Sequence, residues 1–236
     1  NDTGKLPWWG TAWYRKQFPL PATDAGRRVY LDIDGAMSNA QVWINGKHVG
    51  GWPYGYASWR VDLTPHVKPG GANVVAVRLD NPPASSRWYP GGGIYRNVWL
   101  VKTAPVHVAQ YGTFVTTPKV SAASATVNVK TEVRNDSVGS RTVELKTALL
   151  DPDGRTVAML DSRQTIPAGT TVIFDQTGPA LPRPKLWSPD HPCLYRAVSQ
   201  VTDLDRRIET DRYQTTFGIR WFEWTADRGF FLNGEH

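Results

Sequence analysis

Apolar and polar residues alternate along most of this chain, and short turn motifs interrupt the alternation. Residues 28–33 and 74–79 place apolar side chains at every second position, which is the period of a half-buried β-strand. Asn45 and Gly46 stand between two apolar runs and form the dipeptide most typical of a two-residue hairpin turn. No long stretch shows the helical period. The pattern therefore predicts an all-β protein with negligible helix.

A second series of strands begins near Pro105. Apolar positions share one face in each of two neighbouring strands, Ala125, Val127, Val129 and Val133 in the first and Val143, Leu145 and Leu149 in the next. Residues 151–154 (DPDG) form a turn motif, because proline presets one backbone angle and glycine accepts a positive one. About seven strands are expected in this half, the count of an immunoglobulin-like β-sandwich.

Length and charge narrow the class of protein. The 236 residues suit two domains rather than one sandwich. The net charge is +6, but the basic residues are scattered and form no long run, so we expect no nucleic-acid partner. No stretch is long and apolar enough to predict a membrane span. Cys193 is the only cysteine, which rules out a disulfide within the chain.

Residues 87–96 (RWYPGGGIYR) are the most unusual segment. They combine two arginines, three aromatic rings and three consecutive glycines. Aromatic faces can stack on the C–H faces of a sugar, and guanidinium groups can reach its hydroxyls, while glycines free the backbone of a loop. The alternative is a tight turn before a strand at 97–101, with the rings in the core. Eleven tryptophans in the chain favour carbohydrate contact.

Several motifs, in this order and spacing, resemble one family. They are residues 10–18 (GTAWYRKQF), 40–50 (AQVWINGKHVG), 55–56 (GY), 61–64 (VDLT), 74–81 (VVAVRLDN), 186–190 (LWSPD), 194–195 (LY), 217–220 (FGIR) and 229–234 (GFFLNG). The chain resembles the N-terminal part of glycoside hydrolase family 2, which includes β-galactosidases, β-glucuronidases and β-mannosidases. The segment at 87–91 is most similar to the β-galactosidase branch.

The resemblance implies a domain organisation. Residues 1–104 would form a jelly-roll sandwich, galactose-binding-like in fold, and residues 105–218 an immunoglobulin-like β-sandwich. Residues 219–236 would begin a (β/α)8 catalytic barrel that is missing from this chain. The family's two catalytic glutamates lie on that barrel, so the resemblance implies that the parent is a glycoside hydrolase and that this fragment is inactive alone.

The resemblance also implies where sugar would be bound. Loops of the first domain help to wall the sugar pocket of the barrel, and by motif position they correspond here to Trp9, Arg87, Trp88 and Tyr89. We expect these four residues to bind substrate, although other branches can carry an acidic residue in place of Arg87. Arg96 is expected to pair with a nearby acid and to hold the loop.

The chain itself offers no catalytic pair. Glycoside hydrolysis generally needs two carboxyl groups facing one bond. The family's acid/base follows an asparagine, and no Asn–Glu pair occurs in this sequence. Asp32 and Asp34 lie two apart on a predicted strand and share a face, so an acid pair there is conceivable, but turn chemistry before Gly35 explains them as well. The five histidines show no metal-ligand spacing, and we expect no metal and no cofactor.

Three functions compete at this point. The first is the non-catalytic fragment of a β-galactosidase acting on terminal β-galactosides, whose partners would be the missing barrel and the carbohydrate substrate. The second is a stand-alone carbohydrate-binding module that uses the same aromatic residues. The third is a structural or adhesion protein without a ligand. A homo-oligomer and a cytoplasmic or periplasmic location stay open.

Overall fold

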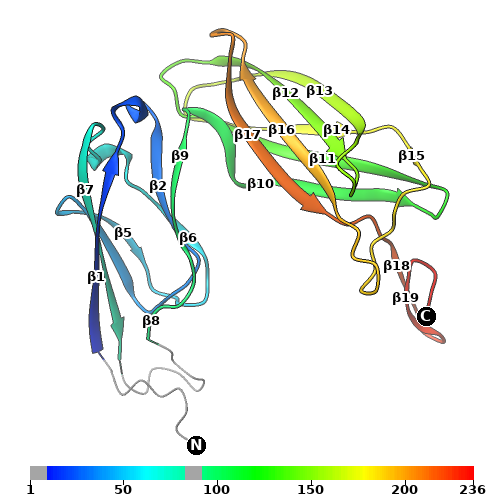
Figure 1. Cartoon of the computed structure of the whole chain (residues 1–236), viewed down its shortest axis with the longest axis horizontal. Coiled ribbons are helices and arrows are strands. Elements are labelled where there is room, and N and C mark those ends of the chain that lie inside the picture. The colour runs from blue at the N-terminus through cyan, green and yellow to red at the C-terminus, as the bar shows by residue number, and fades with distance from the viewer. Residues whose placement is uncertain (1–9, 83–91) are drawn as a thin grey trace, which may run out of the picture. The chain divides into compact units, whose positions relative to one another are not determined.

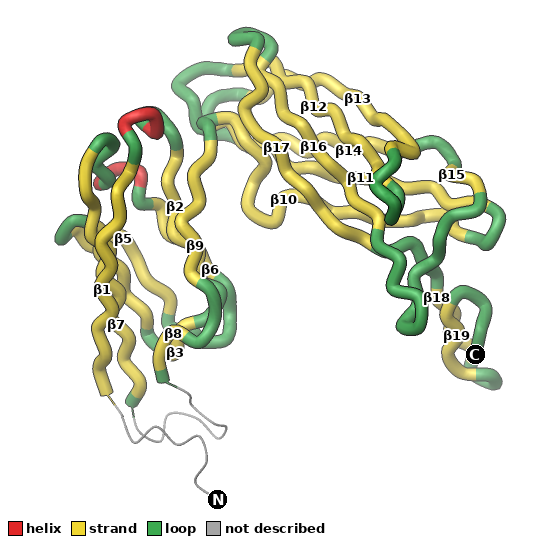
Figure 2. The backbone as a smooth tube through the Cα atoms, viewed as in Figure 1, coloured by secondary structure: helices red, strands yellow, loops and turns green. Residues whose placement is uncertain are grey.

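A computed structural model describes residues 10–82 and 92–236, whose course is shown in Figures 1 and 2. The regular structure of these residues consists of nineteen strands and two short 3-10 turns, without an α-helix. The all-β prediction is therefore confirmed. The chain divides into two compact units, Asn1–Ala104 and Pro105–His236.

The first unit contains two antiparallel sheets. One has the order β1 (Gly10–Leu20), β7 (Gly71–Asn81), β4 (Ala40–Ile44) and β5 (Lys47–Trp52), and the other has the order β6 (Trp59–Asp62), β2 (Arg28–Ile33) and β9 (Val98–Thr103). The short strands β3 (Ala36–Met37) and β8 (Gly93–Ile94) pair with each other. The 3-10 turns are η1 (Ala22–Asp24) and η2 (Thr64–His66).

The core of this unit lies between the two sheets. Val75, Val77 and Leu79 are buried on one face of β7, and Leu31 and Ile33 of β2 belong to the same core cluster. Their spacing of two residues is the alternation that the sequence shows, because successive side chains of a strand point to opposite faces. Two sheets that bury one face each against the other form a β-sandwich.

The hairpin predicted at Asn45 and Gly46 is confirmed. These residues connect β4 to β5 and have φ angles of 50° and 81°. Positive φ at both central positions is what a type I′ turn requires, and asparagine and glycine accept it most readily. The Asn45 side chain also fastens the turn to β7, since its Oδ1 accepts from the Val74 N–H at 2.9 Å and its Nδ2 donates to Asn73 Oδ1 at 2.9 Å.

The second unit contains two larger antiparallel sheets. One consists of β10 (Val106–Val120), β11 (Ser124–Asn135) and β14 (Thr171–Thr177), with β15 (Leu181–Pro182) paired to β11, and the other has the order β13 (Thr156–Ile166), β12 (Arg141–Leu150), β16 (Tyr195–Asp203) and β17 (Ile208–Phe217). A final hairpin pairs β18 (Phe222–Thr225) with β19 (Gly229–Leu232).

The predicted apolar faces form the core of this second sandwich. Val129 of β11 and Leu149 of β12 belong to one core cluster, and Val133 of β11, Leu145 of β12 and Phe174 of β14 belong to a second; all five are fully buried. The predicted turn at 151–154 is also confirmed, because Gly154 has a φ of 85° and donates its N–H to Asp151 O at 2.9 Å. The architecture agrees with the expected immunoglobulin-like sandwich.

The C-terminal hairpin is fastened to a loop of the second unit. Asn233 Nδ2 donates to Trp187 O at 3.0 Å, and the Trp221 N–H donates to Asn233 Oδ1 at 3.2 Å. The Trp187 N–H donates to Ile219 O at 2.8 Å, and Ile219 is fully buried in the core of the unit. The motifs at 186–190, 217–220 and 229–234 therefore meet in space.

A cross-strand ion pair gives the second unit a pH dependence that can be tested. Glu144 accepts from Arg163 Nε at 2.9 Å and pairs with Lys146 Nζ at 3.2 Å. Hydrogen bonds from Arg163 and then from Lys146 lower the pKa of Glu144 below its ordinary value of 4.5. A carboxyl group with a lowered folded-state pKa stabilises the fold above its unfolded pKa, and this contribution is lost as the pH falls through the folded value.

We therefore expect Glu144→Gln to reduce the acid sensitivity of the fold. Between pH 6 and pH 3, the urea midpoint of the parent chain should fall further than that of the variant, because the variant has no carboxylate to protonate at this position. Glu132→Gln, at an exposed position, is the control and should behave like the parent. Equal losses in the parent and Glu144→Gln would contradict the assignment.

Candidate functional site

The four residues predicted to bind sugar, Trp9, Arg87, Trp88 and Tyr89, lie outside the described residues. The structure does describe the strand ends to which their segments are attached. Gly10 begins β1, Asn81 ends β7, and these two residues are paired in the ladder between the strands. The two predicted loop segments are therefore attached at the same end of two neighbouring strands.

Two glycines lie close to side chains of these two strands. Gly93 has a φ of 107°, and a Cβ atom there would lie 2.7 Å from the hydroxyl oxygen of Tyr14. A Cβ atom on Gly92 would lie 3.0 Å from Asn81 Nδ2. The first position needs glycine both for its backbone angle and for space, as the sequence predicts for a glycine-rich loop. Gly92 and Gly93 therefore lie next to β7 and β1.

Segment 37–39 fastens the same end of β7. Ser38 Oγ donates to Asp80 O at 2.7 Å, and the Asp80 N–H donates to Ser38 O at 2.9 Å. Asn39 Nδ2 also donates to Asp80 O at 3.3 Å. These bonds fix the backbone one residue before Asn81, so the attachment point of the predicted sugar-binding loop is rigid.

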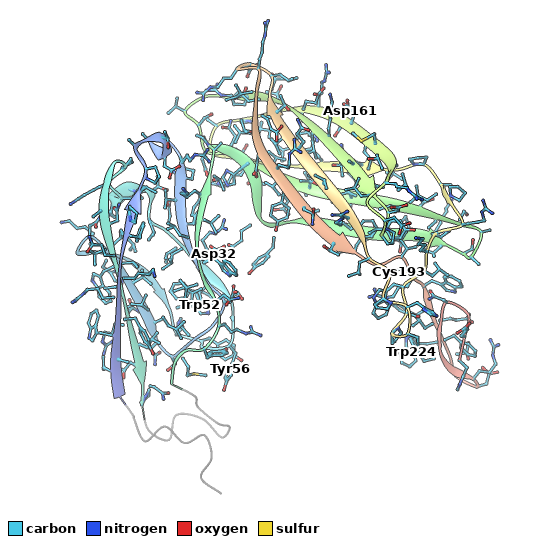
Figure 3. The ribbon with its side chains drawn as sticks, in the orientation of Figure 1. Asp32, Trp52, Tyr56, Asp161, Cys193 and Trp224 are labelled. Atoms are coloured by element: carbon cyan, nitrogen blue, oxygen red, sulfur yellow. The ribbon has the colours of Figure 1, made fainter. Side chains whose placement is uncertain are left out.

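Three tyrosines form a group that the sequence reasoning did not single out as a site. Tyr54 and Tyr56 have ring centroids 5.6 Å apart, and Tyr56 and Tyr95 have centroids 6.3 Å apart, both with edge geometry. Their side chains are between 46% and 60% exposed. We call Tyr54, Tyr56 and Tyr95 the tyrosine ladder. In Figure 3, Tyr56 lies near the end of the unit where β3 and β8 pair.

A polar pocket of about 530 Å³ adjoins the ladder and is lined by Asp34, Ser58, Arg96 and Asn97. The prediction that Arg96 pairs with an acid is wrong for the described part of the chain. There its guanidinium donates to the backbone oxygen of Asp34 at 3.5 Å and lies 6.0 Å from the centre of the Tyr95 ring. The Asp34 carboxylate instead accepts from Trp99 Nε1 at 3.0 Å. The guanidinium thus keeps donors available for a ligand.

The acid pair considered at Asp32 and Asp34 does not form a catalytic site. Asp32 is held by Arg60, whose Nε and Nη2 donate to its two oxygens at 2.6 and 2.8 Å. The Arg60 guanidinium also lies over the Tyr30 ring at 4.6 Å. The bidentate pair occupies both oxygens of the Asp32 carboxylate, whereas glycoside hydrolysis needs two carboxyl groups that face the bond to be broken. Asp32 therefore has a structural role.

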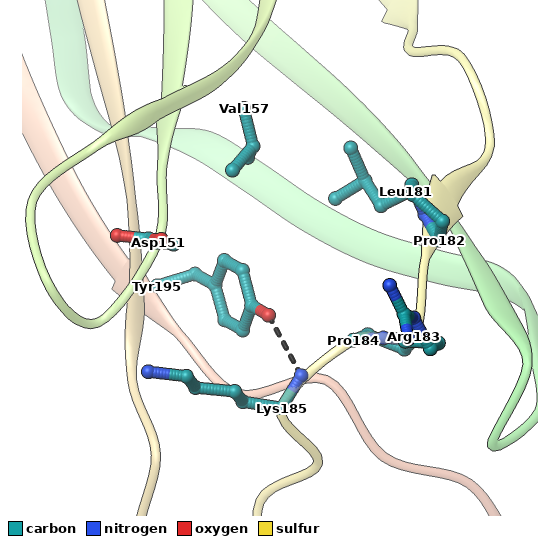
Figure 4. Close-up of a pocket in the computed structure, with 8 residues that line it drawn as sticks. All are labelled: Asp151, Val157, Leu181, Pro182, Arg183, Pro184, Lys185 and Tyr195. Carbon is teal, nitrogen blue, oxygen red and sulfur yellow. Dashed lines mark hydrogen bonds between the residues drawn. The ribbon is translucent and has the colours of Figure 1, made fainter.

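A smaller pocket of about 310 Å³ lies in the second unit (Figure 4). The Tyr195 hydroxyl, which points into this region, accepts from the Lys185 N–H at 2.9 Å, and burial raises the pKa of Tyr195. The Lys185 ammonium is paired with Asp153 at 2.7 Å. Tyr195 and Lys185 thus hold the connector that follows β15.

The described residues also bear on metal binding and on membrane spans. Within residues 10–82 and 92–236, no group of three or more histidine, cysteine, aspartate or glutamate side chains could hold a metal ion. The described part of the chain also lacks any helix that is long and apolar enough to cross a membrane.

Comparisons with known proteins agree with the two sandwiches. Residues 106–220 match the family model described as glycosyl hydrolases family 2, and residues 2–89 match the model described as glycosyl hydrolase 2 galactose-binding domain-like. Two β-sandwiches in this order match the N-terminal sandwich domains of that family. The chain belongs to glycosyl hydrolase family 2, as the motifs predict.

The proteins similar to this chain include some named β-galactosidase and some named β-glucuronidase. The chain is 44% identical over 98% of its length to Beta-galactosidase BoGH2A of Bacteroides ovatus and 34% identical over its whole length to a Beta-glucuronidase of Formosa agariphila. It spans 27% and 26% of those proteins, about a quarter of their length.

Solved structures share the fold. The crystal structure of a family 2 member from Bacteroides cellulosilyticus has a TM-score of 0.91 and 36% identity, with 97% of this chain and 31% of that chain covered. A β-glucuronidase from Bacteroides uniformis has a TM-score of 0.88 and 34% identity, with 97% and 28% covered. The predicted fold class is therefore confirmed for both sandwiches.

Proposed function

We propose that this chain forms the non-catalytic N-terminal domains of a family 2 exo-glycosidase that hydrolyses terminal β-galactosides. The observation that carries the proposal is the 44% identity to a β-galactosidase over nearly the whole chain. In this proposal the boundaries fall after residues 104 and 218, and residues 219–236 lead into a (β/α)8 barrel that supplies both catalytic carboxyl groups.

The role proposed for the first unit is to wall the sugar pocket of that barrel. Gly10 and Asn81 are paired, so the segments that carry Trp9 and Arg87–Tyr89 are attached at one place. The bonds between Ser38 and Asp80 make this place rigid. Binding residues concentrate on loops that a rigid scaffold holds, which supports a role in positioning the substrate.

The exposed aromatic side chains on the final hairpin support the proposed barrel as a partner. Phe222, Trp224 and Phe230 are all exposed, and the Phe230 centroid lies 6.4 Å from that of Phe222 and 4.8 Å from that of Trp224. Figure 3 labels Trp224 on this hairpin. Exposed clusters of large apolar side chains mark surfaces that another protein part covers. A following domain would cover these rings.

A second candidate is a β-glucuronidase with the same organisation. It is favoured by relatives of 34% and 37% identity that carry that name or its putative form. A stand-alone carbohydrate-binding module remains the alternative from a different class, since it would use the same loops without a barrel. Measured hydrolysis of a β-galactoside against a β-glucuronide by the longer protein separates the first two candidates, and absence of both activities favours the third.

The experiment that tests the wall is substitution in the longer enzyme. We expect Arg87→Ala or Trp88→Ala to lower kcat/KM for p-nitrophenyl β-galactoside by about 100-fold, because misplacement of a bound substrate by about 1 Å has an effect of that size. The melting temperature should stay that of the parent, since a binding side chain on a loop contributes little to stability.

A control at an exposed ring of the second unit makes the result specific. Tyr111, on β10, is 70% exposed, and Tyr111→Ala should leave the kinetics of the longer enzyme unchanged. If Arg87→Ala and Trp88→Ala both melt and react like the parent, the loop has no part in the site. If Trp88→Ala instead lowers the unfolding free energy by about 3–5 kcal/mol, the ring belongs to the core.

A further inference from the structure

We propose that the tyrosine ladder and the adjoining polar pocket form a second sugar-binding surface, which binds a neutral pyranose unit of an oligosaccharide. The choice of a sugar as the ligand rests on the proposed function. The surface is built by residues 34–35, 54–58 and 95–97, which do not include any of the four residues predicted to bind substrate.

The rings offer a stacking surface that is already ordered. Tyr54, Tyr56 and Tyr95 contact one another in sequence and remain 60%, 46% and 47% exposed. Tyr95 is held in place because its hydroxyl donates to Gly55 O at 2.8 Å. Rigid aromatic side chains give large contact area at low entropic cost when a ligand binds. The C–H face of a pyranose ring can therefore stack here without reordering the loop.

Two glycines show that the loops are packed to hold these rings. A Cβ atom on Gly35 would lie 2.7 Å from Tyr95 Cζ and 2.9 Å from Arg96 Cδ. A Cβ atom on Gly55 would lie 2.6 Å from Met37 Sδ. The backbone at Gly35 therefore packs directly against Tyr95 and Arg96, and the backbone at Gly55 packs against Met37.

The polar pocket supplies what the hydroxyls of the sugar need. The Arg96 guanidinium has one hydrogen bond among the described residues, to Asp34 O, and so offers several N–H donors. Asp34 also lines the pocket, and among the described residues its carboxylate accepts one side-chain hydrogen bond, from Trp99 to Oδ2, so its other oxygen can accept from a ligand. A donor and an acceptor side by side match two vicinal hydroxyls, and carbohydrate orientation is set by a few such groups.

The charge of the pocket indicates which kind of sugar fits. One guanidinium and one carboxylate line it, together with the uncharged Ser58 and Asn97. These two formal charges cancel, so the pocket has no excess of positive charge to select a uronate. Arg96 lies against the Tyr95 ring, which makes the stacking surface and the polar pocket continuous. A neutral pyranose with one apolar face and vicinal hydroxyls complements both parts.

The test uses the 236-residue chain itself, labelled with nitrogen-15 and titrated with lactose and with cellobiose as neutral probes. We expect the amide signals of residues 54–58 and 92–97 to shift with a dissociation constant in the millimolar range, as suits one exposed stacking face. Tyr56→Ala and Arg96→Ala should each weaken this binding by about tenfold, the effect of removing one aromatic or charged contact. Glucuronic acid at equal concentration should bind no more tightly than the neutral probes.

Matched variants decide the outcome. Tyr111→Ala removes an exposed ring of the second unit and should leave the binding unchanged. Tyr95→Phe keeps the ring but removes the hydroxyl that holds it, and should weaken binding less than Tyr56→Ala. If Tyr56→Ala lowers the melting temperature, Tyr54→Ala and Arg96→Ala carry the test. Absence of shifts at these amides, or unchanged binding by the ladder and Arg96 variants, overturns the proposal.

The outcome of this sugar titration is independent of the test of the proposed hydrolase function. Hydrolysis of a β-galactoside by the longer enzyme, and its loss in Trp88→Ala, concern the loops at residues 9 and 87–89. A chain that fails to bind lactose overturns the second surface and leaves the hydrolase proposal standing. Binding by the chain, together with a longer protein that hydrolyses neither galactoside nor glucuronide, keeps the surface and overturns the hydrolase.

Discussion

We expect the isolated 236-residue chain to release no p-nitrophenol from p-nitrophenyl β-galactoside above the uncatalysed rate. The longer enzyme should accelerate the same reaction by at least about 10⁶-fold, the lower range for enzymes. The difference arises because the reaction needs a carboxylic acid that donates a proton and a second carboxylate at a fixed separation. The measurement is a colorimetric assay on chain produced in a host that lacks β-galactosidase.

The electrostatics of the chain support this expectation. Shifts of pKa are downward for Glu144, Asp153, Asp175 and Glu209, and the largest cause in each is a hydrogen bond, from Arg163, Lys185, Asn128 and Arg212 respectively. A general acid at neutral pH needs a raised pKa. Carboxyl groups held ionised by basic or amide donors are surface or cross-strand partners and do not supply the proton.

The contradicting outcome is specific. Hydrolysis by the isolated chain that disappears when one glutamate is changed to glutamine would show a catalytic carboxyl group within these two sandwiches. The chain has five glutamates to test, Glu132, Glu144, Glu209, Glu223 and Glu235. If the activity survives every glutamate-to-glutamine and every aspartate-to-asparagine substitution, it comes from a contaminating enzyme.

The second large effect concerns stability. We expect Phe174→Ala to lower the unfolding free energy of the second unit by about 3–5 kcal/mol, because a fully buried phenylalanine leaves a cavity when it is truncated. Phe174 is fully buried and packs in one cluster with Val133 and Leu145. Urea denaturation followed through the amide signals of β11 and β14 measures the change in the unit that contains it.

The neighbouring residue provides a matched control. Ile173 lies on the opposite face of β14 and is 54% exposed, so Ile173→Ala should change the free energy by no more than about 0.5 kcal/mol. Similar losses in the two variants would mean that β14 does not present Phe174 to the core. The contrast tests the strand register directly, because a shift of one residue would exchange the two faces.

The buried faces of the strands and the hairpin turn were predictable because each depends only on residues that are close in sequence. The alternation in β7 and β11 sets which face of each strand is buried, whatever the strand pairs with. Asn45 and Gly46 accept positive φ angles by themselves, and they form the turn between β4 and β5. The ordered motifs identified the family and the two sandwiches.

The surroundings of individual side chains were decided only by the tertiary structure. Tyr95 meets Tyr56 because β8 pairs with β3 and returns the chain to that loop, 39 positions away in sequence numbering (95 − 56). Arg96 was expected to pair with an acid, yet its guanidinium contacts the backbone oxygen of Asp34, while Trp99 of β9 donates to the Asp34 carboxylate.

The sequence by itself therefore determined the fold class, the two sandwiches and the family, since strand periodicity, turn chemistry and motif order are properties of neighbouring residues. The tertiary structure alone decided which distant side chains share a surface, among them the tyrosine ladder and the Arg96 pocket. The physical reason is that contacts between strands depend on sheet order and register, which the alternation of a single strand does not encode.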